Sequence, residues 1–187
     1  GDTRQNEQSL AVTIKNLRDG YGRAAFKTAL NDFRSYKHLE MYIHLEALGN
    51  SPINDNELNA FLRIGTDNQD NYYEYSQPLK VTRPGTSDPY SIWPDQNKLD
   101  IQLELFQKAK IARNNALDSD GLPWNISKPF TYVVDGKTII VKGQPDMSKV
   151  RVYMLGVMNP YRNGANPAGD DGLDKNAQIW FNELRLT

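Results

Sequence analysis

The chain has 187 residues, a formal net charge of −1 and a hydrophobic fraction of 39%, and it contains no cysteine. This composition is typical of a soluble globular protein with a core of its own, and it excludes a disulfide scaffold, a thiolate metal site and a cysteine nucleophile. The basic residues are scattered, so nucleic acid is not an expected partner, and no apolar run reaches the ~20 residues of a membrane-spanning helix.

The first residues and the rest of the chain have different expected roles. Residues 1–9 are polar and predict a flexible tail, and the leading Gly1 indicates the remnant of a cleaved tag. Residues 10–187 are expected to form a single β-sandwich domain, excised from a much larger chain.

The first half of the chain predicts strands separated by turns. "LAVTIKNL" at 10–17 alternates imperfectly and predicts a strand, whereas "RAAFKTAL" at 23–30 fits a strand or a short helix. "LEMYIHLEAL" is clearer, because apolar side chains recur at every second residue over 39–46. Two further strands are predicted at 58–66 and 72–79.

The second half begins with a segment rich in proline, "RPGTSDPYSIWPDQN", which predicts a long surface loop at 83–97. A strand at 99–105 then runs into a helix at 105–116. A hairpin is predicted at 130–143 around Asp135-Gly136, which is a strong turn signal. The remaining strands are a central one at 149–159 and the terminal one at 178–186.

These elements favour an all-β fold. Eight or nine strands with one or two short helices, and without a strand–helix–strand rhythm, predict an antiparallel two-sheet β-sandwich. A jelly roll of the galactose-binding type is the expected version. Its interior strands are predicted at 39–46, 58–65, 149–158 and 178–186.

The last strand contains one irregularity, at Asn182. In strict alternation Asn182 shares a side with Trp180 and Leu184, where an apolar residue is expected. One interpretation is that the amide is paired inside the core, with backbone of the segment 10–17 beside it. The other is a bulge at 181–183 that turns Asn182 outward.

A search for catalytic chemistry finds no candidate residue. No nucleophile elbow, H-E-x-x-H, phosphate-binding loop or dinucleotide fingerprint occurs. The two histidines, His38 and His44, lie too far apart on one strand to share a metal, and both are expected at a surface or an interface. A pair of carboxylates of the glycosidase kind stays open, because spatial separation is not visible in a sequence.

Acid and amide residues gather in three predicted loops, at 66–71, 118–121 and 169–176. Calcium takes six to eight oxygen ligands, and such loops can supply them. None has the spacing of a known calcium loop, and turn-forming Asp and Asn explain them equally well. We therefore expect no cofactor, with structural calcium as the open alternative.

Aromatic residues next to loops are the candidate contacts for a ligand or a partner. They are Tyr72, Tyr73, Trp93 and Trp124. Such side chains on a β-sandwich can stack on sugar rings or anchor a protein partner. The alternative is that each one covers an edge of the core.

Five segments, in order along the chain, resemble the SprA family, which is also called Sov. They are "LNAFLRIGTDNQDNYYEYSQPL", "IWPDQN", "KAKIARN", "VKGQPDMSKVRVYMLGVMNP" and "QIWFNELRLT". The members of the SprA family are very large outer-membrane proteins of Bacteroidetes. They are needed for gliding motility and for the type IX secretion system, in which they form the translocon barrel.

The resemblance implies a soluble, non-enzymatic domain of this machinery, with a scaffolding or partner-binding role. Its location would be the cell envelope, associated with the outer membrane and facing the periplasm or the cell surface. Its partners would be other parts of the translocon or of the secretion machinery. Two alternatives remain, a carbohydrate-binding module of the jelly-roll type and a hydrolase acting on glycans, since a fold by itself does not decide function.

Overall fold

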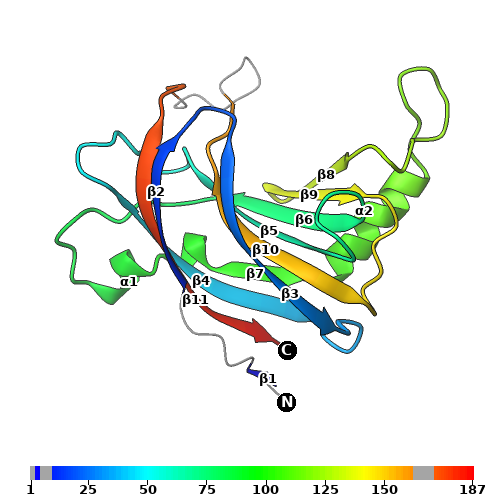
Figure 1. The fold of residues 1–187 in the computed structure, drawn as a ribbon, viewed down its shortest axis with the longest axis horizontal. Helices are drawn as coiled ribbons and strands as arrows, with labels where there is room; N and C mark the ends of the chain where they lie inside the picture. The colour runs from blue at the N-terminus through cyan, green and yellow to red at the C-terminus, as the bar shows by residue number, and fades with distance from the viewer. Residues whose placement is uncertain (1–2, 5–9, 162–170) are drawn as a thin grey trace.

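The structure is a computed structural model, which describes residues 3–4, 10–161 and 171–187. The described residues form two antiparallel sheets that pack face to face (Figure 1). This confirms the predicted all-β sandwich, whereas the jelly-roll connectivity stays a prediction.

The two sheets contain all eleven strands of the described residues. One sheet, called sheet A here, has the order β1-β11-β4-β7, and β2 also pairs with β11. Sheet B has the order β3-β10-β5-β6-β9-β8. The strands of sheet A are β1 (Thr3–Arg4), β2 (Leu10–Leu17), β4 (His38–Ala47), β7 (Leu99–Gln102) and β11 (Lys175–Leu186). Those of sheet B are β3 (Gly22–Asn31), β5 (Asn59–Gly65), β6 (Tyr72–Pro78), β8 (Phe130–Val134), β9 (Lys137–Lys142) and β10 (Val150–Met158).

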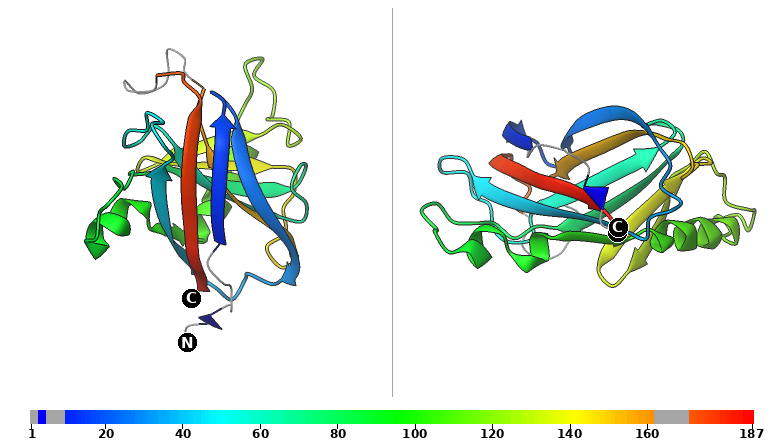
Figure 2. Two further views of the ribbon diagram at one scale, coloured as in Figure 1. Left: turned by 60° about the vertical axis from the view of Figure 1, so that its left-hand side comes forward. Right: turned by 90° about the horizontal axis from the view of Figure 1, so that it is seen from below.

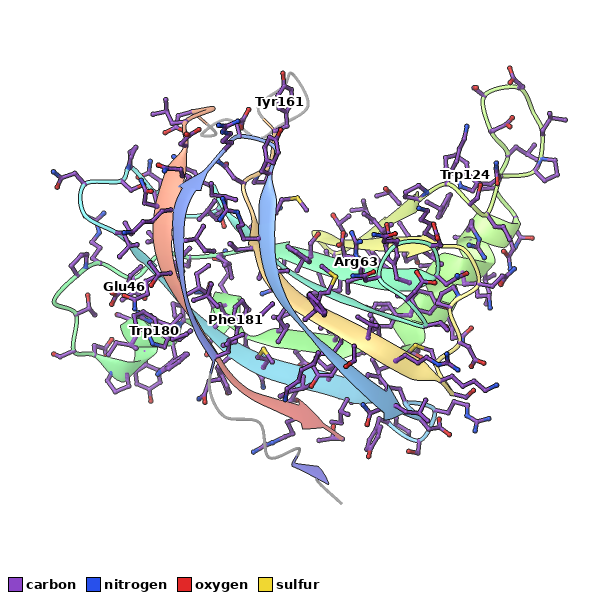
Figure 3. The ribbon with its side chains drawn as sticks, viewed as in Figure 1. Glu46, Arg63, Trp124, Tyr161, Trp180 and Phe181 are labelled. Atoms are coloured by element: carbon purple, nitrogen blue, oxygen red, sulfur yellow. The ribbon has the colours of Figure 1, made fainter. Side chains whose placement is uncertain are left out.

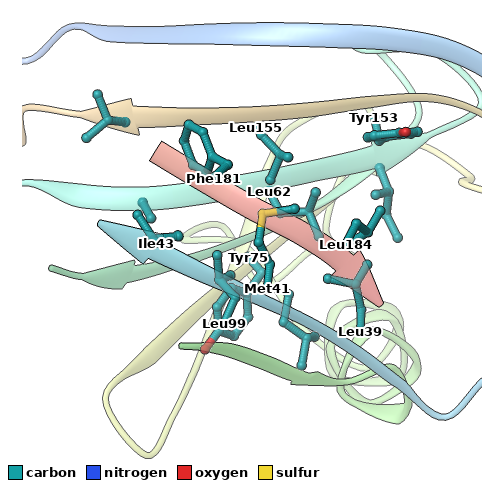
Figure 4. Packing of buried hydrophobic residues seen from close by; sticks show 14 of the residues in the cluster. Leu39, Met41, Ile43, Leu62, Tyr75, Leu99, Tyr153, Leu155, Phe181 and Leu184 are labelled. Carbon is teal, nitrogen blue, oxygen red and sulfur yellow. The ribbon is translucent and has the colours of Figure 1, made fainter. Parts of the chain in front are cut away.

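One core lies between the two sheets. It forms because side chains alternate between the two faces of each strand, and apolar side chains gather on the inner face. Every second side chain of a strand points to the same face, and the core residues of β4, β5 and β6 follow this period, as do those of β10 from Tyr153 onward. Figure 4 shows members of both sheets in contact, with Met41 and Leu62 among them. The predicted strands at 39–46, 58–65 and 149–158 are therefore confirmed, and of the two alternatives left open at 23–30, strand or short helix, the structure has the strand.

The helical elements of the described residues are short. Helix α2 (Glu104–Asn114) follows β7, as predicted, and packs against β8 and β9 through one face that includes Phe106 and Ala109. The hairpin β8–β9 turns at Asp135-Gly136, whose φ angles of 49° and 73° fit a two-residue turn of the primed type. The prediction of a hairpin at this dipeptide is confirmed.

The segment at 83–97, predicted as a surface loop, is more ordered than expected. It contains the short helix α1 (Pro89–Ile92) and the 3₁₀ turn η1 (Asp95–Asn97), and the side chain of Asn97 is fully buried. The side-chain Oδ1 of Asn97 accepts a hydrogen bond from the backbone N–H of Lys80 at 2.7 Å, and its Nδ2 donates to the carbonyl of Lys80 at 2.8 Å. This amide therefore pairs with the backbone as a neighbouring strand would.

Along the last strand, β11, the side chains that point into the core change from odd-numbered to even-numbered residues. Ile179 and Phe181 are buried, the pairing with β4 shifts between Asn182 and Arg185, and the buried residues are then Leu184, within this interval, and Leu186, beyond it. Asn182 lies opposite Tyr42, which is exposed on the outer face of sheet A. Asn182 therefore points outward, as the bulge interpretation predicts, although the register shift lies between 182 and 185 and not at 181–183, and the interpretation of Asn182 as a core residue is wrong. The expected position of the segment 10–17 beside the last strand is confirmed by the pairing of β2 with β11.

One side of the sandwich opens between β2 and β3. Both strands leave the turn at 18–21 and separate along their length, as the views in Figures 1 and 2 show. Strand β3 pairs with β10 alone among the described strands, so it is an edge of sheet B.

Candidate interaction surfaces

The four candidate aromatic residues do not form one site. Tyr72 lies on the outer face of sheet B, Tyr73 on its inner face, Trp93 beside α1, and Trp124 in the loop before β8. In Figure 3, Trp124 and Trp180 lie at opposite ends of the molecule. Trp93 is near Trp180, because the ring of His44 contacts both tryptophan rings. Each of the four residues therefore has surroundings of its own.

Tyr73 belongs to the core. Its ring stacks on that of Phe106 at 5.0 Å between centroids, and this brings α2 against sheet B. Burial raises the pKa of Tyr73 to about 12, although the nearby charge of Arg113 acts to lower it. No solvent-exposed surface of Tyr73 is left for a ligand, so its position fits the structural role.

Tyr72 is part of a charged cluster at the centre of the outer face of sheet B. The guanidinium of Arg63 lies 3.9 Å over the Tyr72 ring. Its Nε and Nη2 donate to the Oε1 of Glu74 at 3.1 and 2.9 Å, and its Nη1 donates to the carbonyl of Asn68 at 2.7 Å. The Glu74 carboxylate is almost fully buried, so the pairing offsets the cost of removing its charge from water.

The turn beside this cluster is held by Asp67. Its Oδ1 accepts from the backbone N–H groups of residues 69, 70 and 71, and its Oδ2 accepts from the Asn71 side chain at 2.8 Å. Burial acts to raise the pKa of Asp67, but these hydrogen bonds outweigh it and hold the pKa at about 2. The turn therefore depends on a charged carboxylate.

His44 is the centre of a second cluster, on the outer face of sheet A. Its Nδ1 lies 2.6 Å from the carbonyl oxygen of Ile92 in α1, and its Nε2 lies 3.0 Å from the Oε1 of Glu46. The ring packs edge-on against Trp180 at 4.8 Å and Trp93 at 5.6 Å. The carbonyl of Ile92 can only accept, so the contact at Nδ1 is a hydrogen bond in which the ring donates.

The two histidines differ in burial, and sequence reasoning did not separate them. His44 is 5% exposed and lies between sheet A and α1, so of the two expected positions, at a surface or at an interface, the surface is wrong for this residue. His38 is partly exposed and its Nδ1 lies 3.3 Å from Asp100. The cover over His44 comes from α1, which lies 48 residues away along the chain.

Trp124 stays within its own loop. Its indole Nε1 donates to the carbonyl of Lys128 at 3.2 Å, and its ring contacts Phe130 edge-on at 5.4 Å. This contact joins the loop to the first residue of β8.

The three acidic loops use carboxylates to close their own turns. Asp118 accepts from the backbone N–H groups of residues 120 and 122, as Asp67 does in its turn. Asp171 accepts from the N–H of Leu173 at 3.0 Å and pairs with the buried ammonium of Lys175 at 2.9 Å, which also binds Glu57 at 2.7 Å. No group of three or more His, Asp or Glu suited to a metal occurs among the described residues.

A cleft of about 650 Å³ lies next to α1. Its walls come from the segments 53–55, 80–86 and 90–94, and they include Lys80, Arg83 and the exposed Tyr90. The Oδ1 of Asp55 accepts from the backbone N–H of Val81 at 2.8 Å, which joins two of the walls.

Strand β3 is the most exposed strand of sheet B. No side chain described on it is buried, and Phe26 and Leu30 are 64% and 73% exposed. On the outer face Phe26 lies opposite Met154. Sequence reasoning did not select these residues, because "RAAFKTAL" shows an apolar pattern but no sign of which side, if any, is covered.

The family model SprA_N, described as a motility related/secretion protein, matches residues 1–187, which is the whole chain. No curated protein matches the sequence of this chain. The chain therefore belongs to the SprA_N family, as the five ordered segments predict, and this membership relates it to motility and protein secretion.

Proposed function

We propose that this chain is a non-enzymatic domain that binds or holds other polypeptides of a motility and secretion apparatus in the cell envelope. Family membership supports the link to motility and secretion. The resemblance to the Sov proteins extends the proposal to the type IX system of Bacteroidetes and to the outer membrane. The partners are other parts of the parent protein or of the secretion machinery.

The observation that carries the proposal is the exposure of β3. Apolar side chains scattered on a surface are ordinary, but Phe26 and Leu30 belong to one strand at the free edge of a sheet. In proteins that act alone, the strand at the edge of a sheet is usually short, covered by another segment or shielded by charges. A binding role explains why this one is left open.

The other features of the chain fit a non-enzymatic role. Among the described residues, the carboxyl groups with a shifted pKa are Asp32, Asp67, Asp146 and Asp171. All four pKa values are lowered, whereas a general acid requires a raised one. The described residues contain no helix that is long and apolar enough to cross a membrane.

Site-specific cross-linking in the native host tests the proposal. A photoreactive phenylalanine analogue at position 26 should cross-link to proteins of the motility or secretion apparatus. The matched control is position 111, since Ile111 is 58% exposed on α2, away from β3. Equal yields at 26 and 111, or no cross-link at either position, would contradict the proposed role of β3.

A carbohydrate-binding role is the second candidate, and the cleft beside α1 favours it. Tyr90 is 82% exposed there and can stack on a sugar ring, while Lys80 and Arg83 can bind its acidic or hydroxyl groups. Binding on a glycan array that is lost in Tyr90→Ala would establish this role. Turnover of any glycoside or peptide would instead show an enzyme.

A further inference from the structure

Strand β8 forms the edge of sheet B opposite to β3 (Figure 1). It pairs with β9, and no other described strand covers its second edge. Its five residues, Phe-Thr-Tyr-Val-Val, are all aromatic or β-branched, and none is charged. Charged residues usually protect an edge strand from pairing with another chain. Each of the other described edge strands contains one or more: Arg4 in β1, Lys15 in β2, Arg23 and Lys27 in β3, and Asp100 in β7.

The register of the β8–β9 hairpin shows which backbone groups point to the open edge. The turn has two residues, Asp135 and Gly136, so Val134 and Lys137 are the hydrogen-bonded pair that closes it. Hydrogen-bonded and non-bonded pairs alternate along an antiparallel ladder. The N–H and C=O groups of Thr131 and Val133 therefore point away from β9, toward the open edge.

These groups match those of a second β8. In an antiparallel pair with a twofold axis at Tyr132, Thr131 of each copy lies opposite Val133 of the other, and each such pair can exchange two hydrogen bonds. The side chains of these two residues are exposed and β-branched, so they would pack against each other on the outer face. On the inner face, half-buried Phe130 would lie opposite half-buried Val134.

The charges next to β8 fit the same register. Asp135 follows the strand and Lys128 precedes it by two residues, and both side chains are exposed. In the pair centred on Tyr132, Asp135 of one copy lies opposite Pro129 of the other and thus next to its Lys128. Each end of the paired strands therefore brings an acid close to a cation, which favours a second copy of this chain as the occupant.

We propose that two copies of this chain pair through β8, antiparallel about a twofold axis at Tyr132, so that sheet B continues from one copy into the other. Two strands of five residues make a small interface, so the dimer should be weak and should depend on concentration. The proposed pairing does not depend on the role of β3, which lies at the opposite edge of the sheet.

Analytical ultracentrifugation over about a 100-fold range of concentration tests the pairing, because association follows mass action. The unchanged chain should pass from monomer to dimer. Val133→Pro removes an N–H that points to the open edge, where an edge strand accepts proline, and it should abolish the dimer. Thr131→Lys/Val133→Lys should do the same, because lysines would then face each other. The matched control Phe26→Lys/Leu30→Lys, at exposed positions of β3, should dimerise as the unchanged chain does.

A charge exchange and single cysteines test the register. A mixture of Thr131→Lys/Val133→Lys with Thr131→Glu/Val133→Glu should form a mixed dimer, since opposite charges then face each other. The chain has no cysteine of its own. Tyr132→Cys should form a disulfide between copies, because a non-hydrogen-bonded pair places its Cα atoms about 4.5 Å apart. Thr131→Cys should not, because its counterpart would lie two residues out of register, beyond the reach of a disulfide.

Several results would overturn the proposed pairing. They are a chain that stays monomeric at every concentration, a dimer that persists in folded Val133→Pro, loss of the dimer in the β3 control, and oligomers larger than a dimer, which a closed twofold pair does not form. Disulfides that form as readily at position 131 as at 132 would overturn the register. Circular dichroism shows whether each variant is folded, and if Val133→Pro is not, the lysine variant and its mixture with the glutamate variant decide. Cross-linking at position 26 is unaffected by any of these outcomes.

Discussion

The segment 80–97 and the strand β3 are both surface regions, but they are fixed in opposite ways. The segment has little regular structure, yet side chains tie its two ends together: Asn97 pairs with the backbone of Lys80, and the hydroxyl of Thr82 donates to the carbonyl of Ser91 at 2.7 Å. The backbone of Thr82 also donates to the carbonyl of Leu45. Strand β3 pairs with β10 from Gly22 to Asn31, with one register shift near its end, and no side chain described on it is buried.

The difference shows that regular backbone and burial are separate properties. A segment without repetitive structure becomes part of the fold when buried side chains satisfy its N–H and C=O groups. An edge strand can pair half of its backbone N–H and C=O groups with one neighbouring strand and leave the other half for a partner. The segment is therefore expected to matter for stability, and β3 for binding.

The largest expected effect comes from removing the amide that fixes the segment. Asn97→Ala removes a fully buried amide together with both of its hydrogen bonds to the backbone of Lys80, which should cost about 3 kcal/mol in the free energy of unfolding. A chain of this size should then melt roughly 6–12 °C lower in a thermal scan. Gln107→Ala, at an exposed position of α2, is the control and should melt as the unchanged protein does. An unaltered melting temperature in Asn97→Ala would show that the segment is not part of the cooperative fold.

The histidines of β4 provide a matched pair for the next effect. His44→Ala removes contacts with Ile92, Glu46 and two tryptophan rings, so unfolding should become easier by about 2 kcal/mol. His38→Ala changes a partly exposed side chain and should cost less than about 0.5 kcal/mol. Denaturant unfolding of the two variants measures the difference. Equal losses would contradict the role of His44 in holding α1.

Acid should act on the turn beside the outer face of sheet B. The pKa of Asp67 is lowered to about 2 by its hydrogen bonds, from an ordinary value of 3.8. A lowered folded-state pKa contributes stability above the ordinary value, and this contribution is lost as the pH falls toward the folded value. Between pH 4 and pH 2, the free energy of unfolding should fall less in Asp67→Asn than in the unchanged chain. If the free energy of unfolding fell equally with pH in both chains, the carboxylate of Asp67 would not contribute to stability.

The smallest effect on stability is expected at β3. Phe26→Ser and Leu30→Ser change exposed side chains, so the free energy of unfolding should stay within about 0.5 kcal/mol of the original value. The same variants should lose cross-linked or co-purified partners in the native host. A loss of stability comparable to that of Asn97→Ala would mean that β3 is covered by contacts of the chain itself, and the contrast between the two regions would fail.

Local patterns in the sequence were sufficient for much of the fold. The alternation at 39–46 and 58–65, the Asp-Gly turn and the strand running into α2 each depend on neighbours a few residues apart. For the same reason the parity change in the last strand was visible as an irregular pattern, since Phe181, Leu184 and Leu186 are all apolar. The family resemblance also required only the order of the segments.

The position of the surfaces depended on residues far apart along the chain. Tyr72 and Tyr73 are neighbours, and alternation predicts that they point to opposite faces, but the contact of Tyr73 with Phe106 decides which of them is in the core. Likewise α1 buries His44, Lys175 reaches Glu57, and β3 is left at an edge. The sequence by itself determined which residues could form strands and turns, because backbone geometry repeats over a few residues. Only the tertiary structure decided which faces were covered, because covering a face requires a segment that a local pattern does not contain.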